Sequence, residues 1–172
     1  MTTVVPTGTD IRVGAGTIRP LRREDRAPLL AILRETEVFT DDEIAIALEL
    51  IDSVIDRPEQ RDYVIRVYEE SSRVLGYYCV GPTPATVATY DLYWIAVDST
   101  VHGGGVGTVL NRDAEDLIRE RGGSLIMVET SSQPRYEKTR LFYRRRGYEE
   151  LARIRDYYRP GDDLVIYGKY LT

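Results

Sequence analysis

A glycine-rich segment, 102–108, constrains the fold of this chain more than any other feature of its sequence. It follows the run 90–97, whose β-branched and aromatic residues predict a strand, and it leads into a predicted helix over 105–121 that ends at Gly122. Glycines at such a junction allow positive φ and a close approach of the backbone to a ligand, while the helix dipole favours an anion. The segment therefore predicts a phosphate cradle. A turn that is merely glycine-rich is the competing interpretation.

The other segments predict an α/β fold. Thr40 and Glu43 have the spacing of a capping box, and apolar residues then repeat at helical intervals until Pro58. The runs 63–68 and 74–80 flank a polar turn and are predicted to pair as an antiparallel hairpin. Since the helices after the fourth and fifth strands can cross over, a mixed, mostly antiparallel sheet flanked by helices is expected. Strands are predicted at 17–21, 63–68, 74–80, 90–97, 124–130, 148–154 and 164–170, and helices at 25–36, between Thr40 and Pro58, at 105–121 and from Pro134 to Arg146.

Length and composition favour a single domain. The chain has 172 residues, of which 42% are apolar and 30% charged, which is enough to bury a core. Residues 1–14 are predicted to form a flexible tail, and 15–172 to form the domain. A net charge of -5 argues against a nucleic acid or an anionic membrane as partner and suits a cationic acceptor. With neither a signal peptide nor a membrane-spanning run visible, a cytoplasmic location is expected.

Two well-known phosphate-binding loops fit the glycine segment poorly. A P-loop needs a lysine after its last glycine, whereas Gly107 is followed by Thr108. A dinucleotide-binding loop would be consistent with Glu129 as a ribose-binding acid at the end of the next strand. However, its third glycine is missing, and residues 98–102 separate the strand from the first glycine. Both alternatives are therefore disfavoured.

Two segments resemble a known family. Residues 97–107 are similar to the acetyl-CoA-binding signature of the GNAT superfamily of N-acetyltransferases, in which Gln/Arg-x-x-Gly-x-Gly/Ala follows a strand and opens a helix. Residues 139–148 resemble the Phe/Leu-Tyr-x-x-x-Gly-Phe/Tyr segment of that family, and the predicted order of elements fits it over nearly the whole chain after the tail. Three positions depart from the family pattern: His102 replaces Gln or Arg, Tyr136 replaces Asn, and Thr139 replaces a small apolar residue.

The resemblance implies acetyl-CoA as a co-substrate and assigns residues to its binding. The glycine loop would hold the pyrophosphate, and the backbone of Ile95 and Val97 would bind the pantetheine arm. Tyr136 and Tyr143 would also contact the cofactor. The loop residues expected at the pyrophosphate are His102, Gly103, Gly104, Gly105, Val106, Gly107 and Thr108.

Direct acetyl transfer to an amine requires an acid and a base, because a typical alkylamine with a pKa near about 10 is protonated at neutral pH. The resemblance places Tyr143 beside the cofactor sulfur as proton donor to the leaving thiolate. Asp91 and Glu129 are the candidate bases, and a water chain is the alternative to both. Strand alternation predicts that Asp91 and Tyr93 share a face with Ile95 and Val97, and a main-chain N–H of this strand is expected to stabilise the oxyanion.

The sequence therefore predicts a GNAT-type N-acetyltransferase that acts without a metal, with a small-molecule primary amine as the first choice of acceptor. A protein lysine or an N-terminal amine stays open, and so does a homodimer. The rival from another class is a non-catalytic CoA-binding or sensory module on the same fold. The acidic run 41–43 and the arginine run 144–146 are interpreted as complements of helix dipoles, so no nucleic-acid partner is expected.

Overall fold

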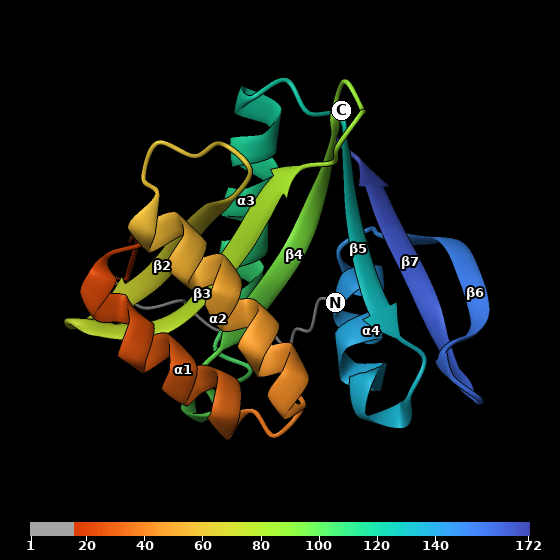
Figure 1. Ribbon diagram of the computed structural model, residues 1–172, viewed down its shortest axis with the longest axis horizontal. Helices are drawn as coiled ribbons and strands as arrows, with labels where there is room; N and C mark the ends of the chain where they lie inside the picture. The colour runs from red at the N-terminus through yellow and green to blue at the C-terminus, as the bar shows by residue number, and fades with distance from the viewer. Residues whose placement is uncertain (1–15) are drawn as a thin grey trace.

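The computed structural model describes residues 16–172, in which one seven-stranded sheet is flanked by helices (Figure 1). The predicted tail at 1–14 lies outside the described residues. Every predicted strand and helix is present within a few residues of its expected bounds. In chain order, the elements are β1 (Thr17–Pro20), η1 (Arg23–Asp25), α1 (Arg26–Glu35), α2 (Asp41–Asp56), β2 (Val64–Glu70), β3 (Arg73–Pro82), β4 (Thr89–Val97), η2 (Ser99–Val101), α3 (Val106–Glu120), β5 (Leu125–Ser131), η3 (Pro134–Tyr136), α4 (Glu137–Arg145), β6 (Glu149–Arg159) and β7 (Asp162–Tyr170).

The sheet is mixed and mostly antiparallel, as the sequence predicts. Its strand order is β1-β2-β3-β4-β5-β7-β6, and β4 with β5 is the parallel pair. Helix α3 forms the crossover between these two strands, because parallel neighbours cannot be joined by a tight turn. The hairpin of β2 and β3 is antiparallel, which confirms the prediction from its polar turn.

Two apolar cores lie on the two faces of the sheet. One packs α3 and α4 against the sheet through residues such as Leu110, Val128 and Phe142. The other packs α1 and α2 against the opposite face around Trp94 and Leu33. Figure 1 shows that α1 and α2 cover the half of the sheet that contains β2 to β4 but do not extend over β5, β7 and β6. On that side, the half of the sheet beyond β4 is free of described helices.

The predicted helix ends are confirmed in detail. The Thr40 hydroxyl accepts a hydrogen bond from the Glu43 N–H, and the Glu43 carboxylate accepts one from the Thr40 N–H, which completes the capping box of α2. Gly122 and Gly147 follow α3 and α4 with φ of +80° and +82°. The amide after each of them bonds back to the last turn of its helix, as glycine-ended helices do.

A β-bulge in β4 overturns one prediction. Cys79 of β3 lies opposite Trp94, and Val80 lies opposite Leu92, so Tyr93 is an extra residue in β4. Tyr93 and Trp94 consequently both face the α1 and α2 side, while Leu92 and the alternate residues after the bulge face α3. The prediction that Asp91 and Tyr93 share a face with Ile95 and Val97 is therefore wrong, because one inserted residue reverses the alternation.

Candidate active site

β4 and β5 diverge after three paired positions. The parallel pairing covers Thr89 to Asp91 and Leu125 to Met127, and Figure 1 shows the two strands separating towards their C-terminal ends. The Asp98 N–H points to β3, because it donates to the Leu75 carbonyl at 2.9 Å. Since successive amides of a strand point to opposite sides, the backbone groups of Ile95 and Val97 point towards β5, which does not pair with them. The opening between the strands is thus lined by backbone groups of β4.

The glycine loop presents a concave row of backbone amides. Gly103 and Gly105 have φ of +82° and +83°, and α3 begins at Val106. In residues 16–172, the N–H groups of Gly103, Gly105, Val106 and Gly107 meet no acceptor. A Cβ on Gly104 would lie 2.9 Å from the Val101 carbonyl oxygen, so glycine is required there as well. Four unpaired amides at the start of a 15-residue helix suit an anionic group such as a phosphate.

Side chains brace this loop against the strand that precedes it. The His102 Nε2 donates to the Val97 carbonyl at 2.9 Å, so this ring ties the loop to the end of β4. Asp98 accepts hydrogen bonds from the Thr100 N–H at 2.8 Å and from the Arg73 guanidinium at 2.6 Å. On the other side, Arg146 donates to the Thr108 hydroxyl. The bracing role of His102 agrees with its position in the loop, and its expected contact with a pyrophosphate stays a prediction.

A cavity of about 430 Å³ lies at the C-terminal ends of β4 and β5. The turn between α1 and α2, the loop after β4, and the start of α4 all contribute to its walls. Arg135 and Lys138 bring two positive charges against the single negative charge of Glu137. The lining residues are Thr36, Val38, Ser99, His102, Pro134, Arg135, Glu137 and Lys138. A cavity with this balance of charge, beside free amides, favours an anionic ligand.

Tyr143 is fully buried in α4 and lies on the α3 side of the sheet. Its ring centroid is 5.2 Å from that of Tyr148 and 6.4 Å from that of Tyr167. Within the described part of the chain, its hydroxyl has no hydrogen-bond partner. Burial raises the pKa of Tyr143 well above its usual value, so the phenol keeps its proton at neutral pH. A buried, unpaired phenol can donate a hydrogen bond or a proton to a group that enters the site.

Tyr136 is also buried, but its hydroxyl is engaged. It donates to the Glu43 carboxylate at 2.6 Å and so joins η3 to the first turn of α2. Burial and this bond raise the pKa of Tyr136 above its usual value. The structure therefore gives Tyr136 a role in holding the cavity walls together, and its expected contact with a cofactor stays a prediction.

The two candidate bases lie on the side of the sheet opposite Tyr143. Asp91 is half-buried and pairs with Met127, and Glu129 is exposed on β5 two residues further along. Burial raises the pKa of Asp91, although hydrogen bonds from Thr83 and Tyr93 act in the opposite direction. Tyr143 and Val128 belong to the core on the other face. The candidate acid and the candidate bases thus lie on opposite faces of the sheet.

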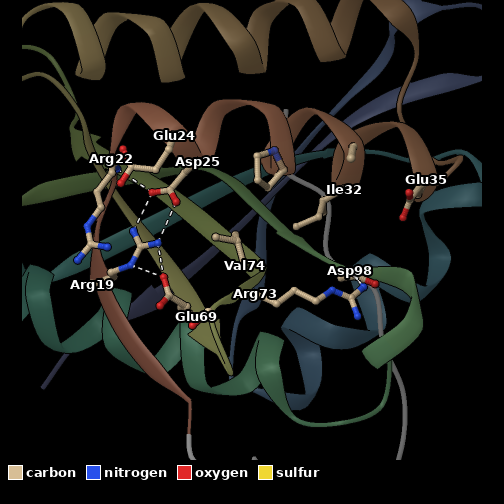
Figure 2. A pocket seen from close by; sticks show the side chains of 13 residues that line it. Arg19, Arg22, Glu24, Asp25, Ile32, Glu35, Glu69, Arg73, Val74 and Asp98 are labelled. Carbon is tan, nitrogen blue, oxygen red and sulfur yellow. Dashed lines mark hydrogen bonds and ion pairs between the residues drawn. The ribbon is translucent and has the colours of Figure 1, made fainter.

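A second cavity, of about 640 Å³, lies between α1 and the turn joining β2 to β3 (Figure 2). Figure 2 shows Arg19 between Asp25 and Glu69, with Arg73 beside Asp98 at the other end. These charges are largely paired with one another. The cavity therefore lies apart from the candidate site, although Asp98 connects it to the base of the glycine loop.

Comparison with known proteins identifies the family. A family model described as an acetyltransferase (GNAT) domain matches residues 61–150. A GNAT-family structure from Desulfovibrio desulfuricans is 35% identical, with a TM-score of 0.89 over 92% of this chain and 100% of the other. The chain belongs to the GNAT family of acetyltransferases. Among the curated proteins, none matches it.

More distant GNAT structures share the fold. An aminoglycoside 6'-N-acetyltransferase crystallised with coenzyme A is 16% identical, with a TM-score of 0.74 over 91% of this chain and 97% of the other. The ribosomal-protein-S18-alanine N-acetyltransferase from Escherichia coli is 18% identical, with a TM-score of 0.71 over 91% of this chain and 94% of the other. At these identities the likeness concerns the fold alone.

Within residues 16–172 of this GNAT protein, no helix is both long and apolar enough to cross a membrane.

Several residues of the candidate site are missed by sequence reasoning. Arg135 and Lys138 line the cavity, and Arg140 donates to the Ser131 and Gln133 carbonyls at 2.6 Å and 3.0 Å, which fixes the chain between β5 and η3. Thr83 reaches Asp91 across a turn. The position of Arg135 and Lys138 at the start of a helix could have indicated a ligand contact. No sequence signal marks Arg140 or Thr83, because the fold determines their hydrogen-bond partners.

Proposed function

We propose that this GNAT protein transfers the acetyl group of acetyl-CoA to a primary amine of a small molecule by direct attack. The observation that carries the proposal is the row of free backbone amides at Gly103, Gly105, Val106 and Gly107. These amides suit a pyrophosphate, and the charges of Arg135 and Lys138 suit a further phosphate on the same ligand. The complex of the aminoglycoside 6'-N-acetyltransferase with coenzyme A supports this choice of ligand.

The remaining parts of the coenzyme also have suitable partners. The backbone groups of Ile95 and the N–H of Val97 point into the opening between β4 and β5, where they can pair with the amides of a pantetheine arm. The Val97 carbonyl already accepts a bond from His102. When bound, the coenzyme supplies an activated acyl group as a thioester. The residues of this chain that hold it would be those of the glycine loop, the end of β4 and the start of α4.

The reaction needs three proton movements. Asp91 or Glu129 would accept a proton from the ammonium form of the acceptor, and the freed nitrogen lone pair would bond to the acyl carbon as the carbon–sulfur bond breaks. The nitrogen would then lose a second proton to solvent to give the neutral amide. Tyr143 would donate its proton to the departing thiolate and regain one from solvent. Its unpaired hydroxyl supports this role, since the hydrogen has no other acceptor in the described chain.

The sheet face near Asp91 supports a cationic acceptor of modest size. Asp91 borders the half of the sheet that α1 and α2 leave uncovered, and Glu129 lies on that half, so a ligand can approach them from solvent. Two negative charges there favour an ammonium group. One structure with the same fold is the ribosomal-protein-S18-alanine N-acetyltransferase from E. coli, so a protein amine is the second candidate.

The replacement Tyr143→Phe tests the proposal. We expect it to lower kcat by roughly 10²-fold or more while leaving coenzyme A binding unchanged, because only the proton donor is removed. The measurements are free-thiol release from acetyl-CoA with a panel of amino acids, polyamines and aminoglycosides, and calorimetry with coenzyme A. Tyr170→Phe is the matched control, since Tyr170 is exposed at the end of β7.

Two outcomes would favour the rivals. A wild-type protein that binds acetyl-CoA but acetylates no amine in the panel would point to a non-catalytic binding module. Acetylation of lysine-containing or N-terminal peptides in preference to small amines would point to a protein acceptor. An absence of any calorimetric signal with acetyl-CoA would refute the proposal at its root.

A further inference from the structure

Two hydroxyl groups flank the carboxylate of Asp91. The Thr83 hydroxyl donates to Asp91 Oδ2 at 2.7 Å, and the Tyr93 side chain is hydrogen-bonded to the same carboxylate. Charge-assisted bonds of this length are strong and directional. The carboxylate therefore has two hydroxyl partners, of which Thr83 is not indicated by the spacing of the sequence.

The fold brings these three residues together in two ways. Thr83 lies just beyond β3, and its N–H donates to the Thr89 carbonyl at 2.9 Å, which closes the turn beside the start of β4. Strand alternation puts Tyr93 on the same face as Asp91, and the bulge then adds Trp94 to that face. The Tyr63 ring meets the Tyr93 ring edge-on, with centroids 5.4 Å apart, and limits its movement. Without the bulge, Trp94 and Asp91 would fall on opposite faces.

Asp91 lies at the point where β4 and β5 separate. It is the last residue of β4 that pairs with β5, so the opening between the strands begins directly after it. It also borders the half of the sheet that carries no described helix on this side (Figure 1). A carboxylate here can meet an acceptor that arrives from solvent at the vertex of the opening.

We propose that Thr83 and Tyr93 are positioning residues that hold the Asp91 carboxylate as the proton acceptor for the incoming amine. The inference rests on the proposed acetyl transfer and selects Asp91 over Glu129 as the base. In the step concerned, the ammonium group of the acceptor gives one proton to Asp91 and becomes the neutral amine, whose lone pair forms the new bond to carbon. Asp91 then returns the proton to solvent.

The surroundings of Asp91 shift its pKa in two opposite directions. Burial raises the pKa of Asp91, and the bonds from Thr83 and Tyr93 limit the rise because they stabilise the charged form. Among residues 16–172, the ionisable groups that face it are Tyr93 on its own strand and, behind that ring, Tyr63. Its partners on the flanking strands, Gly81 and Met127, carry no charge.

Removing either hydroxyl should raise the pKa of Asp91. For Thr83→Val and for Tyr93→Phe we expect a rise of about half to one pH unit each, which corresponds to the loss of one typical hydrogen bond. The acid limb of kcat/KM should move upward by the same amount, up to about a tenfold loss of rate below the limb. Thr83→Ser keeps a hydroxyl and should restore the wild-type profile.

The matched control is Thr86→Val. Thr86 lies in the same turn, but its hydroxyl donates to the Thr83 carbonyl at 2.8 Å and not to Asp91. This variant should leave both the pKa of Asp91 and the pH–rate profile unchanged. If the Thr83 variant loses activity because the turn is disturbed, Thr86→Val should lose activity too. If it loses activity because the pKa of Asp91 rises, the acid limb should shift in Thr83→Val and not in Thr86→Val.

Two measurements separate this inference from the proposed function. Carbon-13 NMR titration of aspartate-labelled protein, with the Asp91 signal identified by its loss in Asp91→Asn, reports the pKa without any acceptor. Thiol release from acetyl-CoA with the amine panel reports the acid limb. Wild-type protein without turnover on the panel refutes the acetyl transfer. Turnover combined with an unmoved Asp91 pKa, or with an unmoved acid limb, overturns the positioning role of Thr83 and Tyr93 alone.

Discussion

Gly105 and Gly122 stand at opposite ends of α3 in almost the same left-handed backbone conformation, with φ of +83° and +80°. A side chain at either position costs about 1 kcal/mol in the folded state, because L-residues avoid this region. Their surroundings differ. Gly105 belongs to the row of free amides, whereas a Cβ on Gly122 would meet nothing within 4 Å. Gly105 is therefore expected to contribute to ligand binding, and Gly122 only to the end of the helix.

We expect Gly105→Ala and Gly122→Ala each to lower the free energy of unfolding by about 1 kcal/mol. Only Gly105→Ala should weaken coenzyme A binding, by roughly tenfold or more, because a shifted loop misaligns several amides at once. Urea denaturation and calorimetry measure the two effects. Equal affinities for coenzyme A in the two variants would contradict the phosphate-binding role of the loop.

At the scale of elements, buried ion pairs connect segments that are distant in sequence. Arg19 of β1 donates to both carboxylate oxygens of Asp25 in η1, at 2.7 Å and 2.8 Å, and also binds Glu69 of β2. Burial alone would raise the pKa of Asp25, but bonds from Arg19 and from the Arg22 N–H hold it below its usual value. The folded state therefore favours the charged form of this carboxyl.

The stability that Asp25 contributes should depend on pH. Because its folded pKa is lower than its unfolded value of about 3.9, the contribution is complete above that pH and is lost as the pH falls through the folded pKa. Asp25→Asn should lower the free energy of unfolding at pH 7 by about 3 kcal/mol and flatten its decline in acid. Asp52→Asn, which breaks an exposed pair with Arg26, should cost at most about 1 kcal/mol. Denaturation curves at several pH values measure these free energies of unfolding. Similar losses of stability in both variants at pH 7 would contradict the burial argument.

At the scale of the whole molecule, the two halves of the sheet are joined weakly at its centre. β4 and β5 share only three paired positions, and the cavity draws residues from both sides of that junction. The bond from Tyr136 to Glu43 and the α3 crossover supply further connections. A ligand that contacts both the glycine loop and α4 should therefore stabilise the entire domain.

Coenzyme A should raise the melting temperature of the protein. At a concentration 100-fold above Kd, binding adds about 2.7 kcal/mol, which corresponds to roughly 5–10 °C for a domain of this size. Differential scanning calorimetry with and without coenzyme A measures the shift, with adenosine as the control that lacks phosphate. A shift of equal size with adenosine would place the binding energy outside the glycine loop.

Local sequence determines much of this protein because the interactions concerned are local. The capping box at Thr40, the glycine ends of the helices and the glycine loop after β4 depend on residues a few positions apart. Hydrophobic periodicity likewise predicts the order of elements and hence the mixed sheet. The motif at 97–107 led to the correct family for the same reason.

Tertiary structure decides which side chains meet in the site. Strand register placed the bulge at Tyr93, reversed the expected faces of β4 and brought Thr83 to Asp91. Folding also committed the Tyr136 hydroxyl to Glu43, 93 positions away in the chain, and left that of Tyr143 without a partner in residues 16–172. Such outcomes depend on pairing between distant strands and helices, and a single inserted residue changes them without altering any local pattern. Thus the sequence alone predicts the loop that suits the coenzyme, whereas the packing of separate elements determines the groups that surround the proposed acceptor.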